Sequence, residues 1–411
     1  MNLLKTKKIE PVLVIAGQGL QSLTSFITGL IIARAGNQDE LGLFALGFSF
    51  CFMAICLSDS LISTPYTYFS AQKNKANHEL FSTGLYGTLF LGIFLAITSL
   101  SITSISTDAL DSISHSLPFA ILTLALREFY RRHLYIHSNA KTVFLGDALT
   151  SALQVCILAA FSYHQGMSAK AAFIAISLAS IASLFLFIHY DKTRINTLSL
   201  GAIRYWLTQY FLYGRWLILG TACHVASIQL YPWLALTGGG TKEAGIYAAC
   251  IALANLLNPL LTGLTNYFRP KLMIAFQEKD SSQFRQYIQS ITALFTIPAI
   301  AFCLVLSLFG EHLLAALYGK DFTQGADALS YMGLAVIAIA ISAPLQLALL
   351  ATRAPITNLI YHGLALGLLT LLSGVFWPSF TTSMLGQIYG AINLTTLVAL
   401  TFMFHKYAPR Q

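Results

Sequence analysis

Charged residues are scarce in this chain: they make up 10% of its 411 residues, against 56% hydrophobic residues. Soluble globular proteins carry roughly 25% charged residues. A chain with so few charged residues cannot form a well-hydrated protein surface, whereas lipid readily solvates long apolar stretches. The composition therefore excludes a soluble domain and predicts a protein embedded in a membrane.

Cysteine is also rare and shows no pairing pattern. All six cysteines fall inside apolar stretches, and no two of them form a CxxC pair. A disulfide framework or a structural zinc site is therefore not expected, and we interpret the cysteines as small core residues. They are Cys51, Cys56, Cys156, Cys223, Cys250 and Cys303.

Catalytic motifs are missing as well. The sequence contains no nucleotide-binding P-loop, no HExxH and no glycine-rich strand-to-helix element. Serine and histidine are common, but no spacing gathers them into a triad. We therefore expect neither an enzyme nor a bound cofactor or metal, and we do not expect ATP-driven transport by this chain alone.

What the chain does have is a series of long apolar stretches. A membrane-spanning helix needs about 20 mostly apolar residues, and twelve segments meet that requirement. The predicted fold class is an all-α integral membrane protein. The expected spans are 12–34, 42–64, 81–104, 116–137, 143–162, 169–190, 209–235, 244–267, 287–309, 327–350, 356–377 and 383–405.

Basic residues alternate between successive loops in this scheme. If the N-terminus is cytoplasmic, most lysines and arginines fall in cytoplasmic loops, as the positive-inside rule requires. Both termini are then cytoplasmic, and the net charge of +8 reflects topology, so nucleic-acid binding is not expected. The basic loop residues include Lys73, Lys75, Lys141, Lys192, Arg194, Arg204, Arg269, Lys271, Lys279, Arg285 and Arg353.

A weak internal repeat appears at an offset of 203 residues. Segments 33–45 and 237–248 each contain a glycine-bearing loop followed by Gly-apolar-aromatic-Ala at the start of a helix. The repeat divides the chain into two six-helix bundles, 1–205 and 206–411. Parallel repeats of this kind carry a transport site between the halves. Chance similarity between two apolar helices is the alternative.

Polar residues recur at helical spacing in the same places. Gln18 and Gln21 begin a stripe that continues through Ser25 and Thr28, and the repeat offset carries Gln21 to His224. Amides cannot face hydrocarbon cheaply, so these stripes predict a hydrated cleft around a central cavity. Ordinary hydrogen bonding between helices is the alternative. A further stripe begins with Asn255 and Asn258.

Several ionisable residues lie inside the predicted spans. Arg127 lies about 15 Å into its helix at 1.5 Å per residue, and Arg131 follows one turn later. Arginine forks fit phosphate oxygens in two-point contacts, so both are candidate substrate-binding residues. The alternative is a shorter helix whose arginines reach the membrane surface. Glu128 and Arg132 are expected to form an i, i+4 salt bridge.

Three more residues complete the candidate site. Arg215 is a third candidate for binding substrate, although an interfacial anchor position explains it equally. Asp59 is a candidate coupling residue that could take a proton or pair with an arginine. His224 is the second coupling candidate because histidine titrates near physiological pH; a neutral, hydrogen-bonded histidine is the alternative. Asp147 is expected at the membrane interface.

Three segments of the chain carry a resemblance to a known family. The first runs from Ile31-Ile32-Ala33-Arg34-Ala35-Gly36 to Leu41-Gly42-Leu43-Phe44-Ala45. The second is Leu317-Tyr318-Gly319-Lys320-Asp321-Phe322, and the third is Ala351-Thr352-Arg353-Ala354-Pro355. These segments resemble the O-antigen (Wzx-type) polysaccharide flippases of the multidrug/oligosaccharidyl-lipid/polysaccharide (MOP) exporter superfamily. With the six-plus-six helix plan, the match extends over nearly the whole chain, although no motif is specific by itself.

The resemblance implies two six-helix bundles around a central cavity and alternating access driven by an ion gradient or the membrane potential. The implied substrate is an undecaprenyl-pyrophosphate-linked oligosaccharide, moved across a bacterial inner membrane from the cytoplasmic to the periplasmic leaflet. The implied partners are this lipid-linked oligosaccharide, the lipid bilayer and the polysaccharide polymerase machinery, and a monomer is expected.

Two other function classes remain open. A multidrug or cation antiporter shares the fold, but such antiporters favour carboxylates in the cavity, and here arginines outnumber the buried acid Asp59. A membrane polysaccharide polymerase or ligase needs a sizeable periplasmic loop with catalytic groups. The longest such loop here, about 310–326, is short and lacks paired basic residues.

Overall fold

The computed structural model describes residues 2–72, 78–106, 108–137, 139–164, 166–191, 193, 199–278, 281–351 and 356–407. The chain divides into two compact units, Met1–Val225 and Ala226–Gln411. The division falls inside a helix, twenty residues after the boundary at residue 205 that the repeat suggested. The first segment of that helix therefore belongs to the first unit.

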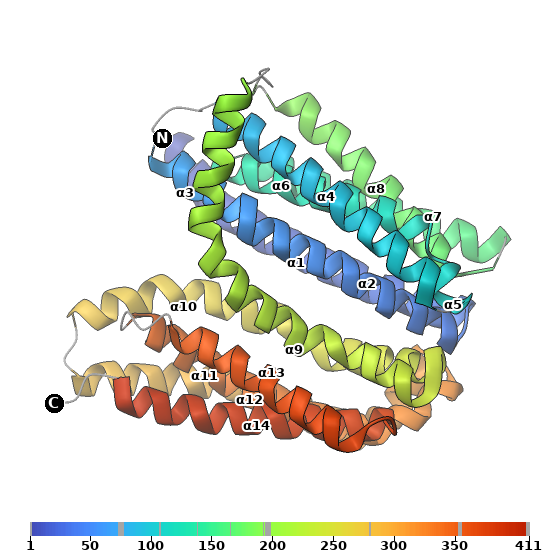
Figure 1. Ribbon diagram of the computed structural model, residues 1–411. Coiled ribbons are helices and arrows are strands. Elements are labelled where there is room, and N and C mark those ends of the chain that lie inside the picture. Colours follow the sequence, from blue (N-terminus) through green and yellow to red (C-terminus); the bar gives the residue numbers. More distant parts are fainter. Residues whose placement is uncertain are drawn as a thin grey trace. The chain divides into compact units, whose positions relative to one another are not determined.

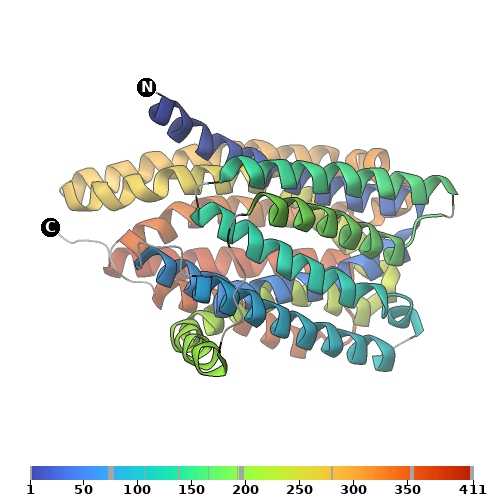
Figure 2. The ribbon, with the colours of Figure 1, turned by 90° about the horizontal axis from the view of Figure 1, so that it is seen from above.

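The first unit consists of long helices that run side by side, coloured blue to green in Figures 1 and 2. The second span is continuous but changes from α-helix to one π-helical turn, η1, before continuing as α3. The helices are α1 (Asn2–Ala35), α2 (Gln38–Ser58), η1 (Asp59–Ser63), α3 (Thr64–Gln72), α4 (His78–Ser106), α5 (Asp108–Asp111), α6 (Ser116–Ile136), α7 (Ala140–His164), α8 (Ala169–Tyr190) and the start of α9 (Leu200–Ala254).

The second unit repeats this plan with the rest of α9 and the helices that follow it. Its first span ends at Gly239 and Gly240, where the backbone of α9 leaves helical geometry. Gly240 has φ 72°, a conformation that favours glycine because it has no Cβ. The later helices are η2 (Asn255–Leu257), α10 (Asn258–Glu278), α11 (Ser281–Leu317), η3 (Lys320–Gly325), α12 (Ala326–Ala351), α13 (Ile356–Phe376) and α14 (Thr382–Tyr407).

The predicted fold class is confirmed. Ten helices in the described ranges are long and apolar enough to cross a membrane, and one of them, Leu217–Arg269, contains two spans separated by the glycine turn. The remaining span is α6, which has the required length but carries more charge than the other spans. The chain is therefore a multi-pass, all-helical membrane protein with the twelve spans expected from the sequence.

Each unit contains an equivalent internal hydrogen bond that the sequence repeat did not reveal. In the first unit, the Glu40 carboxylate accepts a hydrogen bond of 2.7 Å from the backbone N–H of Ala169, the first residue of α8. In the second unit, Glu243 accepts a hydrogen bond from the backbone N–H of Thr382, the first residue of α14. Glu40 and Glu243 are 203 positions apart, so the offset read from the sequence is reproduced in three dimensions.

Candidate functional site: a polar cavity in the first unit

The first unit contains a polar cavity of about 420 Å³. Its lining comes from α1, α2, η1, α6 and the first segment of α9. All of these residues precede the boundary at Val225, so the first unit forms the cavity by itself. The polar lining residues are Gln18, Ser58, Asp59, Ser60, Ser63, Glu128, Arg131, Arg132, Tyr135, Thr221 and His224.

The π-helical turn η1 forms one wall of the cavity. A π-turn inserts an extra residue into a helix and is frequent at functional sites. Here it begins at Asp59, whose Oδ2 accepts a hydrogen bond of 3.2 Å from the Thr64 hydroxyl. Asp59 Oδ1 lies 2.6 Å from Nη2 of Arg132. Both side chains of this ion pair are close to half exposed, at 41% and 46%.

Behind this wall, two guanidinium groups and two carboxylates form a closed ring. Arg127 and Arg131 each contact a different oxygen of Asp147, at 2.7 and 3.0 Å. On the other side, each contacts a different oxygen of Glu128, at 3.1 and 2.7 Å. The ring joins α6 to α7, and opposite charges alternate around it.

Three of the four ring members are buried, and the fourth, Glu128, is 28% exposed where it lines the cavity. The buried charges are stable only because each has an oppositely charged partner. Asp147 is fully buried, and Arg127 and Arg131 are 4% and 8% exposed. An isolated charge in such a place is costly, so removing one partner destabilises a protein by about 3–5 kcal/mol. Gln21 on α1 adds a hydrogen bond of 3.1 Å from its Nε2 to Asp147 Oδ1. The backbone of α1 also approaches closely, because a Cβ added to Gly17 would lie 2.9 Å from Asp147 Oδ2.

The first segment of α9 closes the cavity against η1. The hydroxyls of Ser60 and Thr221 lie 2.7 Å apart. Two helical turns before Thr221 on α9, a Cβ added to Gly214 would lie 2.7 Å from the backbone oxygen of Ser60. Only glycine therefore allows this close approach. Sequence reasoning did not anticipate this contact between Ser60 and Thr221.

The predicted site residues fall into three groups. Gln18, Asp59, Arg131 and His224 line the cavity. Arg127 and Gln21 lie behind it in the charged ring. Arg215 is exposed on α9 and is not part of the cavity lining, while Asn255 and Asn258 belong to the second unit.

Asn255 and Asn258 lie at a break between helices rather than along one continuous stripe. The 3-10 turn η2 begins at Asn255 and α10 begins at Asn258. Both side chains are exposed, and Asn258 Nδ2 donates a hydrogen bond of 2.9 Å to Asn255 Oδ1. Of the third segment that resembles the flippases, residues 352–355 lie outside the described residues.

One pairing prediction is wrong, and one residue was undervalued. The expected salt bridge between Glu128 and Arg132 does not occur among the described ion pairs, since Arg132 pairs with Asp59 across to η1. Asp147 was expected at the membrane interface, but its carboxylate is fully buried and holds both ring arginines. The signal in the sequence that could have revealed this role was the polar stripe of α1. Gln21 donates a hydrogen bond to Asp147, and Thr28 accepts one from Gln154, so both contacts join residues 126 positions apart.

The positive and negative charges in and behind the cavity are equal in number, but hydrogen-bond donors outnumber the acceptors that they reach. Three guanidinium groups, of Arg127, Arg131 and Arg132, face three carboxylates. Guanidinium groups only donate hydrogen bonds and carboxylates only accept them. The Nε atoms of Arg127 and Arg131 are buried and have no hydrogen-bond partner among the described residues. The site is therefore rich in donors.

No protein-family model and no curated protein matches the sequence, but solved structures do match the fold. An inward-facing multidrug resistance MATE family transporter of the MOP superfamily aligns at TM-score 0.79 with 14% sequence identity, covering 94% of this chain and 95% of that one. The fold is that of the MATE transporters. An outward-facing structure of such a transporter aligns over 98% of this chain and 95% of that one, at TM-score 0.68 and 14% identity.

A third solved structure with a similar fold is described by the polarity of its binding pocket. It is described as "Reverse polarity of binding pocket suggests different function of a MOP superfamily transporter from Pyrococcus furiosus Vc1 (DSM3638)". It aligns at TM-score 0.67 with 15% identity, covering 99% of this chain and 97% of that one. At these identities the MATE likeness establishes the fold, and the function of this chain has to be argued from its own residues.

Proposed function

We propose that this protein is a flippase that moves an undecaprenyl-pyrophosphate-linked oligosaccharide from the cytoplasmic to the periplasmic leaflet of a bacterial inner membrane. The observation that carries the proposal is the donor-rich cavity, in which Arg131 and Arg132 stand side by side on α6. A pyrophosphate presents many acceptor oxygens and fits arginine forks in two-point contacts.

The ion pair between Asp59 and Arg132 is the natural entry point for the pyrophosphate. It is nearly half exposed, and exposed ion pairs contribute only about 0–1 kcal/mol. A phosphate can therefore replace Asp59 on Arg132 at little cost. The buried ring behind it, held by Asp147, stays intact and supplies Arg131 as the second contact.

The rest of the lining suits a sugar. Hydroxyls and an amide line the cavity between the charged groups, and such groups both donate and accept hydrogen bonds. Sugar hydroxyls need partners of both kinds. Gln18, Ser58, Ser63 and Tyr135 are therefore proposed contacts for the sugar nearest the pyrophosphate.

Release of Asp59 also gives a route to coupling. Substrate that displaces Asp59 from Arg132 leaves this carboxylate free to interact with a coupling ion. Asp59 and His224, which lines the same cavity, are therefore the proposed coupling residues. Alternating access, with both termini cytoplasmic and no cofactor, completes the proposed cycle, and the polysaccharide polymerase machinery is the proposed receiver of the product.

A multidrug antiporter is the second candidate, and one observation favours it. Asp59 lies in the cavity with 41% of its side chain exposed, as a site for a cationic drug would require. However, the carboxylates of Asp59, Glu128 and Asp147 are each already paired with arginine. A cation must displace a guanidinium from one of these carboxylates, just as an anion must displace Asp59 from Arg132. The surplus of hydrogen-bond donors, shown by the Nε atoms of Arg127 and Arg131 that lack a partner among the described residues, favours the anion.

A transport assay in proteoliposomes that contain the full-length protein distinguishes the two proposed functions. The assay follows a radiolabelled undecaprenyl-pyrophosphate-linked disaccharide by its accessibility to an external lectin, with proton-driven ethidium uptake measured in parallel. We expect the wild-type protein to move the lipid-linked sugar across the membrane. Arg132→Ala should slow this translocation by roughly 10- to 100-fold, the effect of losing a hydrogen bond to a charged group. Arg204→Ala, which removes an exposed arginine outside the cavity, is the matched control. Ethidium transport without sugar translocation would overturn the proposal.

A further inference from the structure

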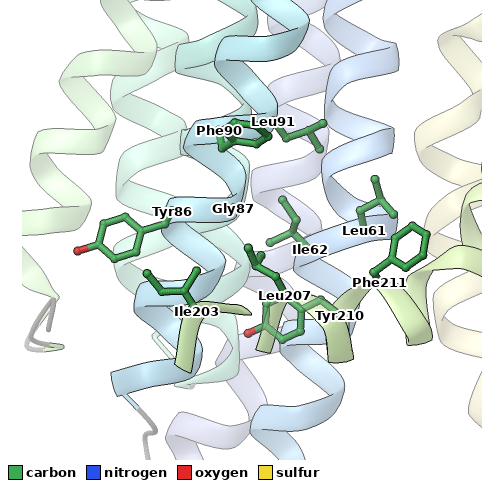
Figure 3. A pocket seen from close by; sticks show the side chains of 10 residues that line it. All are labelled: Leu61, Ile62, Tyr86, Gly87, Phe90, Leu91, Ile203, Leu207, Tyr210 and Phe211. Atoms are coloured by element: carbon green, nitrogen blue, oxygen red, sulfur yellow. The ribbon is translucent and has the colours of Figure 1, made fainter. Parts of the chain in front are cut away.

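A second, apolar groove lies on the other side of η1. It has a volume of about 350 Å³ and is formed by η1, α4 and the first segment of α9. Figure 3 shows the side chains of Ile62 and Leu207 between the rings of Tyr86 and Phe211, with Phe90 beyond them. The groove belongs entirely to the first unit.

The two tyrosines of this groove contribute their rings and not their hydroxyls. The Tyr210 hydroxyl donates a hydrogen bond of 2.9 Å to the backbone oxygen of Leu80. The Tyr86 hydroxyl points away from the other lining side chains in Figure 3. The remaining lining residues are aliphatic, phenylalanine or glycine, so the groove offers its occupant only apolar contacts.

One π-turn lines both the apolar groove and the polar cavity. Asp59, Ser60 and Ser63 line the cavity, while Leu61 and Ile62, which lie between them in sequence, line the groove. The five residues of η1 thus present a charged, hydroxyl-rich face to one side and an aliphatic face to the other. An occupant that contacts both faces has to be an amphiphile with an anionic head directly attached to an apolar chain.

We propose that this groove binds the isoprene units nearest the pyrophosphate of the lipid carrier. The inference rests on the proposed function, because it places the head of the same molecule in the polar cavity. The far rim of the groove is open: Phe90 and Phe211 are 76% and 58% exposed. The rest of the chain therefore continues from this rim into the bilayer, while the groove fixes the end that enters with the head.

Gly87 on α4 keeps the groove open. A Cβ built at Gly87 would lie 3.2 Å from Leu207 Cδ2 and 3.4 Å from Ile62 Cδ1, at the point where the three elements meet. A leucine at this position fills the space that the chain would occupy, and the flexible ends of Leu207 and Ile62 can yield to it. Gly87→Leu is thus a direct block of the groove. Gly367→Leu, at an exposed position of α13 with open space around it, is the matched control.

The test uses a benzophenone-bearing undecaprenyl phosphate probe on the full-length protein in nanodiscs, with labelled peptides identified by mass spectrometry. We expect labelling on α4 and on the first segment of α9, and competition by unlabelled undecaprenyl phosphate. Gly87→Leu should reduce this labelling roughly fourfold or more, because each excluded CH₂ loses its apolar burial. Gly367→Leu should leave it unchanged.

Two results would overturn the groove assignment. One is equal labelling of the same peptides by a benzophenone-bearing phosphatidylglycerol, which marks the groove as a place for ordinary bilayer lipid. The other is labelling that Gly87→Leu does not reduce. If either result occurs while Arg132→Ala still blocks sugar translocation, the groove assignment is wrong and the proposed flippase function is retained. If the wild type moves no lipid-linked sugar, the proposed function fails whatever the labelling pattern.

Discussion

Glu40 and Glu243 lie 203 positions apart, and each accepts a hydrogen bond from the first backbone amide of a later helix in its own unit, α8 for Glu40 and α14 for Glu243. The first amides of a helix have no partner within the helix, and its N-terminus carries partial positive charge. A carboxylate there satisfies a donor and favours the helix dipole. The repeated contact shows that both units fasten their sixth helix to the start of their second by the same means.

This contact predicts matched losses of stability. Glu40→Ala and Glu243→Ala should each lower the free energy of unfolding by about 0.5–2 kcal/mol, the range for loss of a helix N-cap. The double variant should lose about the sum, because the two carboxylates share no hydrogen-bond partner. Thermal unfolding in detergent measures this. Lys242→Ala, next to Glu243 and exposed, serves as control, and a double variant no worse than one single would contradict independence.

Asp147 should be far more important for stability than Asp59. Asp147→Asn leaves the buried Arg127 and Arg131 with Glu128 as their one carboxylate partner and should cost about 3–5 kcal/mol, as for other broken buried ion pairs. Asp59→Asn affects a pair that is nearly half exposed and should cost about 0–1 kcal/mol. The comparison is a thermal unfolding series in one detergent. Equal effects of the two variants would show that the ring does not depend on its buried charge.

The end of α8 should show a pH-dependent contribution to stability. Burial alone raises the pKa of Asp191, but hydrogen bonds from His133 and from the backbone and hydroxyl of Thr193 outweigh it and lower that pKa below its ordinary value. The carboxylate therefore stabilises the fold above about pH 3.9, its unfolded pKa, and this contribution is lost as pH falls through the lower folded value.

Asp191→Asn tests this contribution. The variant should unfold at a lower temperature than the wild type at pH 6, and the difference should shrink as the pH approaches 3. Melting temperatures measured by intrinsic fluorescence at closely spaced pH values follow the effect. Asp321→Asn, an exposed residue of η3, provides the control. A difference that stays constant down to pH 3 would exclude Asp191 ionisation as its source.

The contact between Ser60 and Thr221 offers a way to fix α9 against η1. Their hydroxyls lie 2.7 Å apart, and beyond Val225 the same helix continues into the second unit. In a background without the six native cysteines, Ser60→Cys with Thr221→Cys should form a disulfide under copper phenanthroline. We expect the oxidised protein to lose translocation and the reduced protein to regain it, because alternating access requires α9 to move. Full activity of the cross-linked protein would show that α9 stays fixed on η1 throughout transport.

Much of the fold was predictable because membrane solvation imposes simple rules. Apolar length predicted all twelve spans, including α6, where Arg127, Glu128, Arg131 and Arg132 raise the charge of the helix. The repeat offset of 203 was also predictable, from a few glycine and aromatic residues. The carboxylates at Glu40 and Glu243 went unnoticed, since an acidic residue in a loop has no distinctive pattern until its partner helix is known.

The candidate site was predictable only in part. Gln18, Asp59, Arg131 and His224 were chosen because polar groups inside a span require a reason, and they do line one cavity. Their pairings were not predictable. Arg132 lies near Glu128 along its own helix, yet it pairs with Asp59, which is 73 positions away.

The sequence by itself determined that this protein spans a membrane many times. It has too few charged residues to solvate a water-exposed surface, and its apolar segments are long enough to cross a bilayer. Only the tertiary structure decided which charges neutralise one another. Ion pairing depends on the distance between side chains from different helices, and helical periodicity fixes which face a residue occupies but not which neighbour that face meets. That is why Asp147 emerged as the centre of the buried ring, and why one π-turn came to separate a polar cavity from an apolar groove.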